Sequence, residues 1–265
     1  MTEAWPIPVM RVLVLLGLNM VPIWGFTEQQ WSPGTALALY WMQSAFSIPI
    51  TAVLIVMHRR ATHKWGHYNA TSATSVNAGP AVTKRSTFLA GFLWMSIPFV
   101  VAHAIFLAFI LGVVWKDAAG GVDREDLRVG TVAMLNIMAL GFALDTFRLG
   151  QRPFAWIRHR SETLMQRTLV VHLAIVFGMG VAAFADNDAA AFFGVFLALK
   201  LLVDLAGELP QWDPKEPPGW IVWLANRLGD GKTDIHADWK LRRAGQKAGF
   251  EADERSVDPA ELERR

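Results

Sequence analysis

The sequence contains no cysteine among its 265 residues. This absence excludes disulfide bonds, thiolate catalysis and metal sites with cysteine ligands. It does not identify a redox compartment, because a chain without cysteine fits reducing and oxidising surroundings equally. Charge is also sparse: 18% of the residues are charged, against about a quarter in a typical soluble domain. The formal net charge of +2 gives no reason to expect a nucleic-acid partner.

Apolar residues are abundant and gathered into long runs. They make up 53% of the chain, and the mean hydropathy is +0.29. A helix of about 20 residues crosses the hydrocarbon core of a bilayer, roughly 30 Å thick. The sequence therefore predicts an all-α, polytopic transmembrane helical bundle of about six spans within residues 1–210. The expected spans are residues 5–26, 33–57, 87–115, 129–147, 164–185 and 189–209.

Lysine and arginine are distributed unevenly between the connecting segments. If the N-terminus is cytoplasmic, the outer loops contain only Lys116, Arg124 and Arg128. Most other basic residues then fall on the inner side, including Arg11, five between residues 59 and 85, and five between residues 148 and 167. This asymmetry predicts that both termini are cytoplasmic. The expected location is the bacterial cytoplasmic membrane, with the lipid bilayer as the principal partner.

Composition changes after the last expected span. Four prolines between residues 210 and 218 end the helix, and residues 211–265 form the expected cytoplasmic tail. Residues 220–228 contain Trp220, Trp223 and several aliphatic residues, which predicts a short amphipathic helix along the cytoplasmic surface, in contact with anionic lipid. Residues 229–265 are charged, and we expect them to be mobile or loosely helical.

No motif predicts a cofactor or a metal. Residues 229–233 resemble the end of a phosphate-binding loop, but the full pattern requires glycine where this chain has Asn226, and no apolar strand precedes it. His58, His63 and His67 share one basic segment. Their spacing does not align all three on one helical face, so the sequence predicts solvated histidines rather than a metal site.

Polar side chains within the expected spans are the candidate functional residues. Such groups are costly in lipid and usually face the bundle interior or a water path. Nine side chains qualify: Asn19, Gln43, His103, Asn136, Asp145, His172, Lys200, Asp204 and Glu208. The last three are spaced by four and share a helix face, so Lys200 and Asp204 can pair directly. Counting along the spans puts His103, His172, Lys200 and Asp204 at similar depth, which predicts an intramembrane polar cluster.

Two interpretations of this cluster stay open. It is either a proton relay or binding site for a small polar ligand, or a structural ion pair with histidines hydrogen-bonded between helices. For Glu208, near the interface, the structural interpretation is favoured. The leading hypothesis is a small-solute or ion permease, or a proton-coupled membrane component. The alternatives are a structural or accessory membrane protein with a basic tail and, third, an intramembrane enzyme using His103, His172 and Asp204, although no catalytic residue is assigned.

Several short motifs, in order, resemble one known family. They are Leu-Asn-Met-Val-Pro at residues 18–22 with Trp31 and Tyr40-Trp41, Ile-Pro-Phe-Val-Val-Ala-His at 97–103, Arg167 followed by Val-His-Leu-Ala-Ile at 171–175, and Leu-Lys-Leu-Leu-Val-Asp-Leu at 199–205. Their order and spacing over residues 12–210 are similar to the domain-of-unknown-function family 6498, uncharacterised prokaryotic membrane proteins. The resemblance implies a polytopic membrane architecture and carries no activity.

Three positions depart from the pattern of that family. The resemblance implies an acid after the tyrosine–tryptophan pair, where this chain has Gln43. It implies a second histidine after His103, where this chain has Ile110, and a histidine near the end of the last span, where it has Glu208. If relatives use those groups for chemistry, this chain has altered or lost it.

Overall fold

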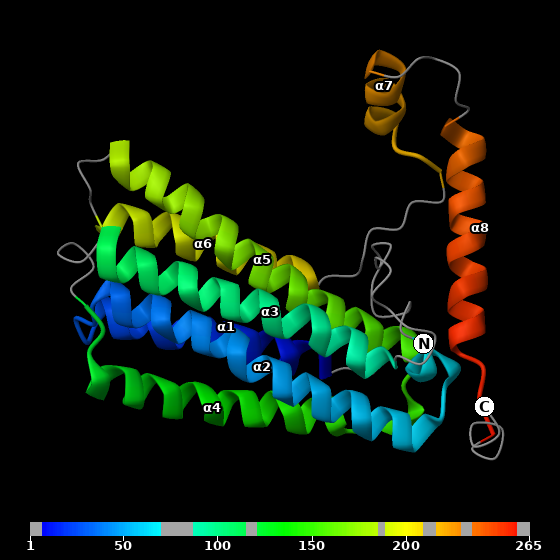
Figure 1. The fold of residues 1–265 in the computed structure, drawn as a ribbon, viewed down its shortest axis with the longest axis horizontal. Coiled ribbons are helices and arrows are strands. Elements are labelled where there is room, and N and C mark those ends of the chain that lie inside the picture. Colours follow the sequence, from blue (N-terminus) through cyan, green and yellow to red (C-terminus); the bar gives the residue numbers. More distant parts are fainter. Residues whose placement is uncertain are drawn as a thin grey trace.

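Long helices dominate the computed structural model, which describes residues 7–69, 87–114, 121–184, 189–208, 216–228 and 235–258. Figure 1 shows the long helices running alongside one another, with α7 and α8 at one end of the bundle. In chain order the elements are α1 (Ile7–Thr27), α2 (Pro33–Thr62), the 3₁₀ turn η1 (Trp65–Tyr68), α3 (Phe88–Phe109), the π-helical turn η3 (Ile110–Val114), α4 (Arg124–Thr146), the 3₁₀ turn η4 (Leu149–Gln151), α5 (Phe154–Phe184), α6 (Ala189–Glu208), α7 (Gly219–Leu228) and α8 (Ile235–Asp253).

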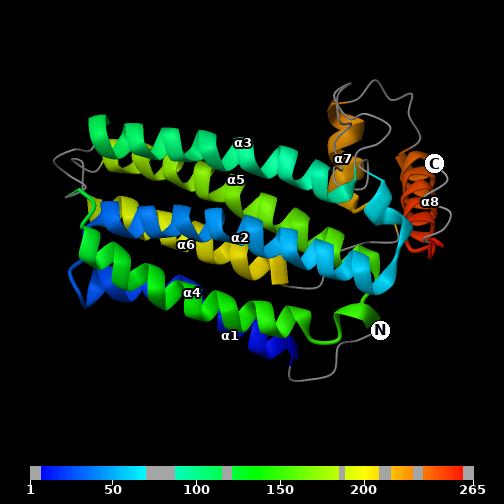
Figure 2. The same cartoon turned by 60° about the horizontal axis from the view of Figure 1, so that its bottom comes forward.

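Helix α2 is the centre of the bundle. It contacts α1, α3, α4, α5 and α6, while α5 packs along α6 and α1 packs along α4. Figure 2 shows α2 between α3 and α5 on one side and α4 and α1 on the other. Its buried side chains include Leu39, Tyr40, Leu54 and Ile55, all with at most 1% exposure. The core is therefore built around the second helix of the chain.

Within the residues that the structure describes, four helices are long and apolar enough to cross a membrane: Val9–Thr27, Pro33–Thr62, Phe88–Gly112 and Arg124–Thr146. Large apolar side chains point outward from the bundle, with Trp94, Ile105 and Leu202 each at least 65% exposed. A soluble protein rarely exposes so much apolar surface, whereas lipid requires it. The chain is accordingly a membrane protein with an all-helical described structure.

Helix boundaries differ from the expected spans where local capping extends a helix. Helix α4 begins at Arg124 rather than 129, because the Asp123 side chain accepts hydrogen bonds from the Glu125 and Asp126 amides. Such a carboxylate satisfies amides that have no partner inside the helix and favours its positive end. Helix α2 continues to Thr62, five residues beyond the expected end, so that His58 lies within the helix.

Helix α5 begins at Phe154, ten residues before the expected start at 164. The Ala155 amide at this start has no partner inside the helix. It donates a hydrogen bond of 2.9 Å to the carboxylate of Glu254, which lies 99 residues later in the chain. The added turns carry Arg160, which pairs with Asp145 of α4, and Arg158, which pairs with Asp253 at the end of α8. Hydropathy alone could not locate this start, because Arg158, His159 and Arg160 in the second turn interrupt the apolar run.

The described part of the tail, residues 235–258, forms a regular helix and a turn that contacts the bundle, rather than the mobile or loosely helical segment that was expected. Residues 229–234 and 259–265 lie outside the described residues. Residues 235–253 form α8, and the following turn pairs with the segment after α2 through a Lys64–Ser256 β-bridge. The Trp65 amide donates to the Arg255 carbonyl at 2.8 Å, and the Val257 amide donates to the His63 carbonyl at 2.9 Å. This backbone pairing acts together with charged contacts of the same segment, in which Lys64 meets Glu254 and Arg158 meets Asp253.

Candidate functional site

Lys200 and Asp204 form the ion pair that their spacing on α6 allows. The Lys200 Nζ lies 2.6 Å from the Asp204 Oδ2, and the two side chains are 5% and 2% exposed. Residues four apart lie one above the other on a helix, so no chain rearrangement is needed to bring them together. A lone charge at this position would be strongly disfavoured, and the pairing reduces that cost.

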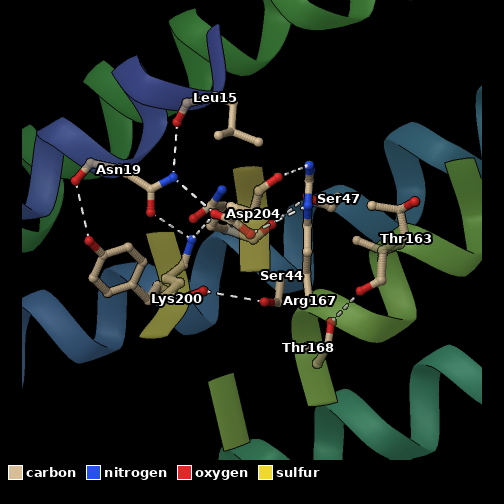
Figure 3. A network of polar contacts seen from close by, with 12 residues as sticks. Leu15, Asn19, Ser44, Ser47, Thr163, Arg167, Thr168, Lys200 and Asp204 are labelled. Atoms are coloured by element: carbon tan, nitrogen blue, oxygen red, sulfur yellow. Dashed lines mark hydrogen bonds and ion pairs between the residues drawn. The ribbon is translucent and has the colours of Figure 1, made fainter. Parts of the chain in front are cut away.

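Asn19 joins this pair to α1. Its side-chain oxygen accepts from Lys200 at 2.9 Å, and its amide nitrogen donates to Asp204 and to the Leu15 carbonyl, both at 2.9 Å. The Tyr40 hydroxyl on α2 donates to the Asn19 carbonyl at 3.2 Å, and the Lys200 ammonium lies 4.7 Å from the centre of the Tyr40 ring. Figure 3 shows Asn19, Lys200 and Asp204 pointing toward one another.

Arg167 on α5 supplies a second cation to Asp204. Its Nε lies 3.4 Å from the Asp204 Oδ1, and its Nη2 donates to the Asp204 carbonyl at 3.3 Å. The two helices approach closely one turn away, where a Cβ on Gly207 would lie 2.9 Å from the Thr163 Cγ2. We call Asn19, Tyr40, Arg167, Lys200 and Asp204 the polar centre.

A second charged group lies nearer the end of the bundle. The Asp145 carboxylate at the end of α4 pairs with Arg11 of α1 at 3.1 Å and with Arg160 of α5 at 2.9 Å. The guanidinium of Arg11 also lies 5.5 Å from the centre of the Trp156 ring, and that of Arg152 lies 4.2 Å from it. One buried carboxylate thus ties α1 to the consecutive helices α4 and α5.

A cavity of about 90 Å³ connects the two charged groups. Its apolar wall comes from α1, α2, α4 and α5, and its polar wall contains hydroxyls, an amide and charges. The polar lining residues are Gln43, Ser44, Ser47, Thr51, Asp145, Arg160, Arg167, Lys200 and Asp204. We call it the central cavity. A space of this size and polarity suits several waters or one small polar solute.

The other predicted site residues are not all brought to the central cavity. His103 is buried on α3 but does not line it, and Asn136 is exposed on the outer surface of α4. His172 lies on α5 and Glu208 ends α6, but their side chains lie outside the part that the structure describes. Asn19, Gln43 and Asp145, three other candidates among the nine polar residues of the expected spans, do contribute to the polar centre or the cavity wall.

Arg160, Arg167 and Tyr40 were missed as site residues. In the sequence, both arginines were used in the count of basic residues on the cytoplasmic side. That count does not show that their side chains point into the bundle. Their spacing of seven residues was a usable signal, because it puts them on one face of a helix, two turns apart. Tyr40 belongs to one of the motifs of the family resemblance, but its place in the polar centre could not be predicted, because it depends on how α1, α2 and α6 pack.

Two of the three histidines near the end of α2, His58 and His67, contradict the expectation that these histidines are solvated. His58 and His67 are 0% and 1% exposed, and the His58 Nδ1 lies 2.7 Å from the His67 Nε2. The other His58 ring nitrogen lies 3.1 Å from the Arg152 carbonyl, and the His67 ring packs edge-on against Phe154. The cause is the extra length of α2, which carries His58 into the core. Within the described residues, no three His, Asp or Glu side chains are grouped so as to hold a metal ion.

Comparison with known proteins gives a family and no more. No curated protein and no solved structure matches the chain. A family model matches residues 4–219, which include α1 to α6 and every residue of the polar centre, and leave out α8 and nearly all of α7. The chain belongs to this family, a family of unknown function designated DUF6498.

Proposed function

We propose that this protein is a six-span membrane protein in the bacterial cytoplasmic membrane, and that it passes a small polar solute or ion, or protons, through the central cavity. The observation that carries the proposal is the cavity itself, lined by Lys200, Asp204 and Arg167 inside helices whose outer surfaces are apolar. Ionisable side chains within membrane spans usually face the bundle interior or a water-filled cavity rather than lipid, and they often mark a path for ions or protons.

Two more helices complete the proposed six spans. Helix α5 has 31 residues and α6 has 20, and at 1.5 Å per residue each is long enough for the hydrocarbon core. They pack along each other, and α6 also packs on α1. The polar centre links α1, α2, α5 and α6, so α5 and α6 share the depth of the other spans.

One end of the bundle is strongly basic, which supports a cytoplasmic placement of that end. Arg11, Lys64, Arg152, Arg158 and Arg160 all lie there, since Arg11 and Arg160 meet Asp145 while Lys64 and Arg158 meet the end of α8. Positive residues are retained on the cytoplasmic side. Helices α7 and α8 lie at this same end, where they would meet anionic lipid (Figure 1).

A purely structural role for the Lys200–Asp204 pair explains the pair itself but not the polar wall of the central cavity. Structural pairs need their partners and tight packing, and Lys200, Asp204 and Asn19 have both. They do not need a neighbouring cavity with three hydroxyl-bearing side chains, Ser44, Ser47 and Thr51, on one wall. Apolar side chains of similar size would close that space at lower cost. The polar wall therefore favours a path for water or solute.

The absence of cysteine makes a direct test simple, because any introduced cysteine is the only one. Ser47→Cys puts a thiol on the cavity wall with little change in volume. Ile105→Cys, on a 67% exposed and lipid-facing position of α3, is the control. Each variant is treated with a charged, membrane-impermeant thiol reagent in sealed vesicles of either orientation.

We expect Ser47→Cys to react and Ile105→Cys to stay unreactive, because only the cavity admits water and a charged reagent. Reaction from both sides of the membrane would indicate a path that opens to each side. If Ser47→Cys reacts from neither side, the cavity is closed and the transport proposal is wrong. The structural interpretation of the polar centre would then be the better one.

A further inference from the structure

One polar side chain faces outward in the middle of a membrane span. Asn136 is exposed on α4, between Val132 and Leu140, which are themselves 53% and 51% exposed. Among the described residues of α1 to α4, every other exposed hydroxyl, amide or charged side chain lies in the first or last five residues of its helix. Asn136 therefore differs from all the other outward-facing positions of these four spans.

The position of Asn136 along α4 leaves its amide in hydrocarbon. It follows Arg124 by twelve residues and precedes Thr146 by ten, so at 1.5 Å per residue it lies about 18 Å and 15 Å from the two ends of the helix. These distances match half of the roughly 30 Å hydrocarbon core. An asparagine side chain is too short to reach the headgroups, as a lysine or arginine can. Lipid tails offer it no hydrogen bond.

No group of the described structure pairs with this amide. The Asn136 side chain makes no hydrogen bond within the described residues, whereas Asn19, in the first span, bonds to Lys200 and Asp204 inside the bundle. Figure 1 shows α4 along one edge of the bundle. An amide without a partner in hydrocarbon is costly, and polar groups in spans usually face protein or water. The outer face of α4 is therefore expected to be covered by protein.

A second copy of the chain is the occupant that fits this face. Two copies inserted in the same direction and related by a twofold axis along the membrane normal present the same residue at the same depth. An asparagine amide has two donor hydrogens and one acceptor oxygen, so each of two Asn136 side chains can donate to the other. Hydrogen bonds of this kind between helices stabilise helix association in membranes.

The neighbouring residues allow two α4 helices to approach closely. Ala139 and Ala143 are exposed, one turn apart, on the same side of α4 as Asn136. Small residues at this spacing let helix backbones come together, which two short asparagine side chains require in order to meet. The alanines alone would not identify an interface, but the amide beside them supplies a reason for one. Val132 and Leu140 add apolar contact above and below it.

We propose that the protein forms a homodimer in the membrane through the outer face of α4, with the two Asn136 side chains hydrogen-bonded to each other. The interface goes beyond the proposed function, because it does not involve the central cavity. The α4 residues that line the cavity are on the opposite side of the helix: Met138, Gly141, Phe142 and Asp145. Each copy therefore keeps its own cavity.

The test measures dimerisation of the purified full chain in phosphatidylcholine vesicles. Copies that carry a donor or an acceptor fluorophore on Gly150→Cys are mixed, and energy transfer is followed as the protein is diluted with lipid. Asn136→Leu makes a lipid-facing position more apolar, so it does not hinder folding of the single copy. We expect it to weaken dimerisation about tenfold in apparent Kd. Gln166→Leu makes the same change at an exposed position of α5 and should leave the Kd unchanged.

Single cysteines then locate the interface. Under mild oxidation in membranes, Ala143→Cys should form a disulfide between two copies, and Ile105→Cys, at a 67% exposed position of α3, should not. A chain that is monomeric at every dilution, a dimer that Asn136→Leu leaves intact, or equal crosslinking of both cysteine variants would overturn the proposal. Crosslinking of Ala143→Cys to a different protein in native membranes, with none between copies, would also overturn it and assign the face to another partner.

Discussion

The side-chain amide of Asn19 donates a hydrogen bond of 2.9 Å to the carboxylate of Asp204, 185 positions later in the chain. This contact joins α1 to α6 in the interior of the bundle, and the Lys200 ammonium closes the triangle with bonds to both residues. The earliest and latest of the long helices are thus joined by a buried polar contact rather than by apolar packing alone.

The two members of the ion pair should differ in their importance. Lys200→Met leaves Asp204 with Arg167 and Asn19, whereas Asp204→Leu removes a carboxylate that Lys200 and Arg167 both contact. Breaking a buried pair costs about 3–5 kcal/mol in soluble proteins, and less in a membrane. We expect Asp204→Leu to lower the Tm and folded yield in detergent more than Lys200→Met does.

The double variant Lys200→Met with Asp204→Leu serves as the reference for that comparison. If the pair is structural, the double variant recovers much of the folded yield. If the pair is functional, it folds but changes the reactivity of Ser47→Cys. Equal and normal yields for both single variants would show that the two groups are not buried together.

The stability of the protein should fall in mild acid because of His67. Burial, followed by repulsion from His58 and Arg59, lowers the pKa of His67 to about 3. The unfolded chain takes up a proton on His67 near pH 6.5, whereas the folded chain does not. The contribution of neutral His67 to the free energy of unfolding is therefore complete above pH 6.5 and is lost as the pH falls toward 3. At pH 5 the loss is about 2 kcal/mol.

The check is chemical unfolding in detergent at pH 7.5 and pH 5 for the natural chain and for His67→Gln, which cannot titrate. We expect the variant to be less stable at neutral pH, since a buried contact to His58 is lost, but also less sensitive to acid. His236→Gln, on an exposed part of α8, is the control and should keep the original pH dependence. An unchanged pH dependence in His67→Gln would contradict the burial of this imidazole.

Docking of the chain end should depend on Glu254. Its carboxylate accepts from the Ala155 amide at the start of α5, and its backbone carbonyl accepts from Lys64. Glu254→Ala removes the capping interaction, which costs about 1 kcal/mol. We expect faster tryptic cleavage after Arg255 and faster hydrogen exchange at the Trp65 amide. Glu251→Ala, on an exposed position of α8, should change neither. Equal cleavage of both variants would exclude the capping role.

Helix α7 should lie along the membrane surface. Trp220 and Trp223 are 60% and 59% exposed, and neither packs into the bundle core. Single cysteines in place of these tryptophans, labelled with a fluorophore, should be quenched strongly by nitroxides at the lipid headgroups. A label at Gly150, exposed in the turn after α4, provides the aqueous comparison. Labels on α7 that respond only to a water-soluble quencher would contradict this placement.

The sequence predicted those features that depend on a pattern within a single helix. Hydropathy located the long helices, and the spacing of four located the Lys200–Asp204 pair. The contacts of Asn19 with α6 and of Arg167 with Asp204 could not be predicted, because they depend on which helices are neighbours. The same reason hid the His58–His67 contact. Docking of residues 253–257 depends on backbone pairing, which leaves no mark in hydropathy or charge.

The placement of the chain across the membrane is the claim on which the cavity, the basic end and the tail all depend. Topology reporters fused after Ala70, Gly120, Gly150 and Asp188 and at the C-terminus test it most directly. Six spans with a cytoplasmic N-terminus predict the order inside, outside, inside, outside, inside. A C-terminal reporter found outside, or reporters at Gly150 and Asp188 on the same side, would contradict the account.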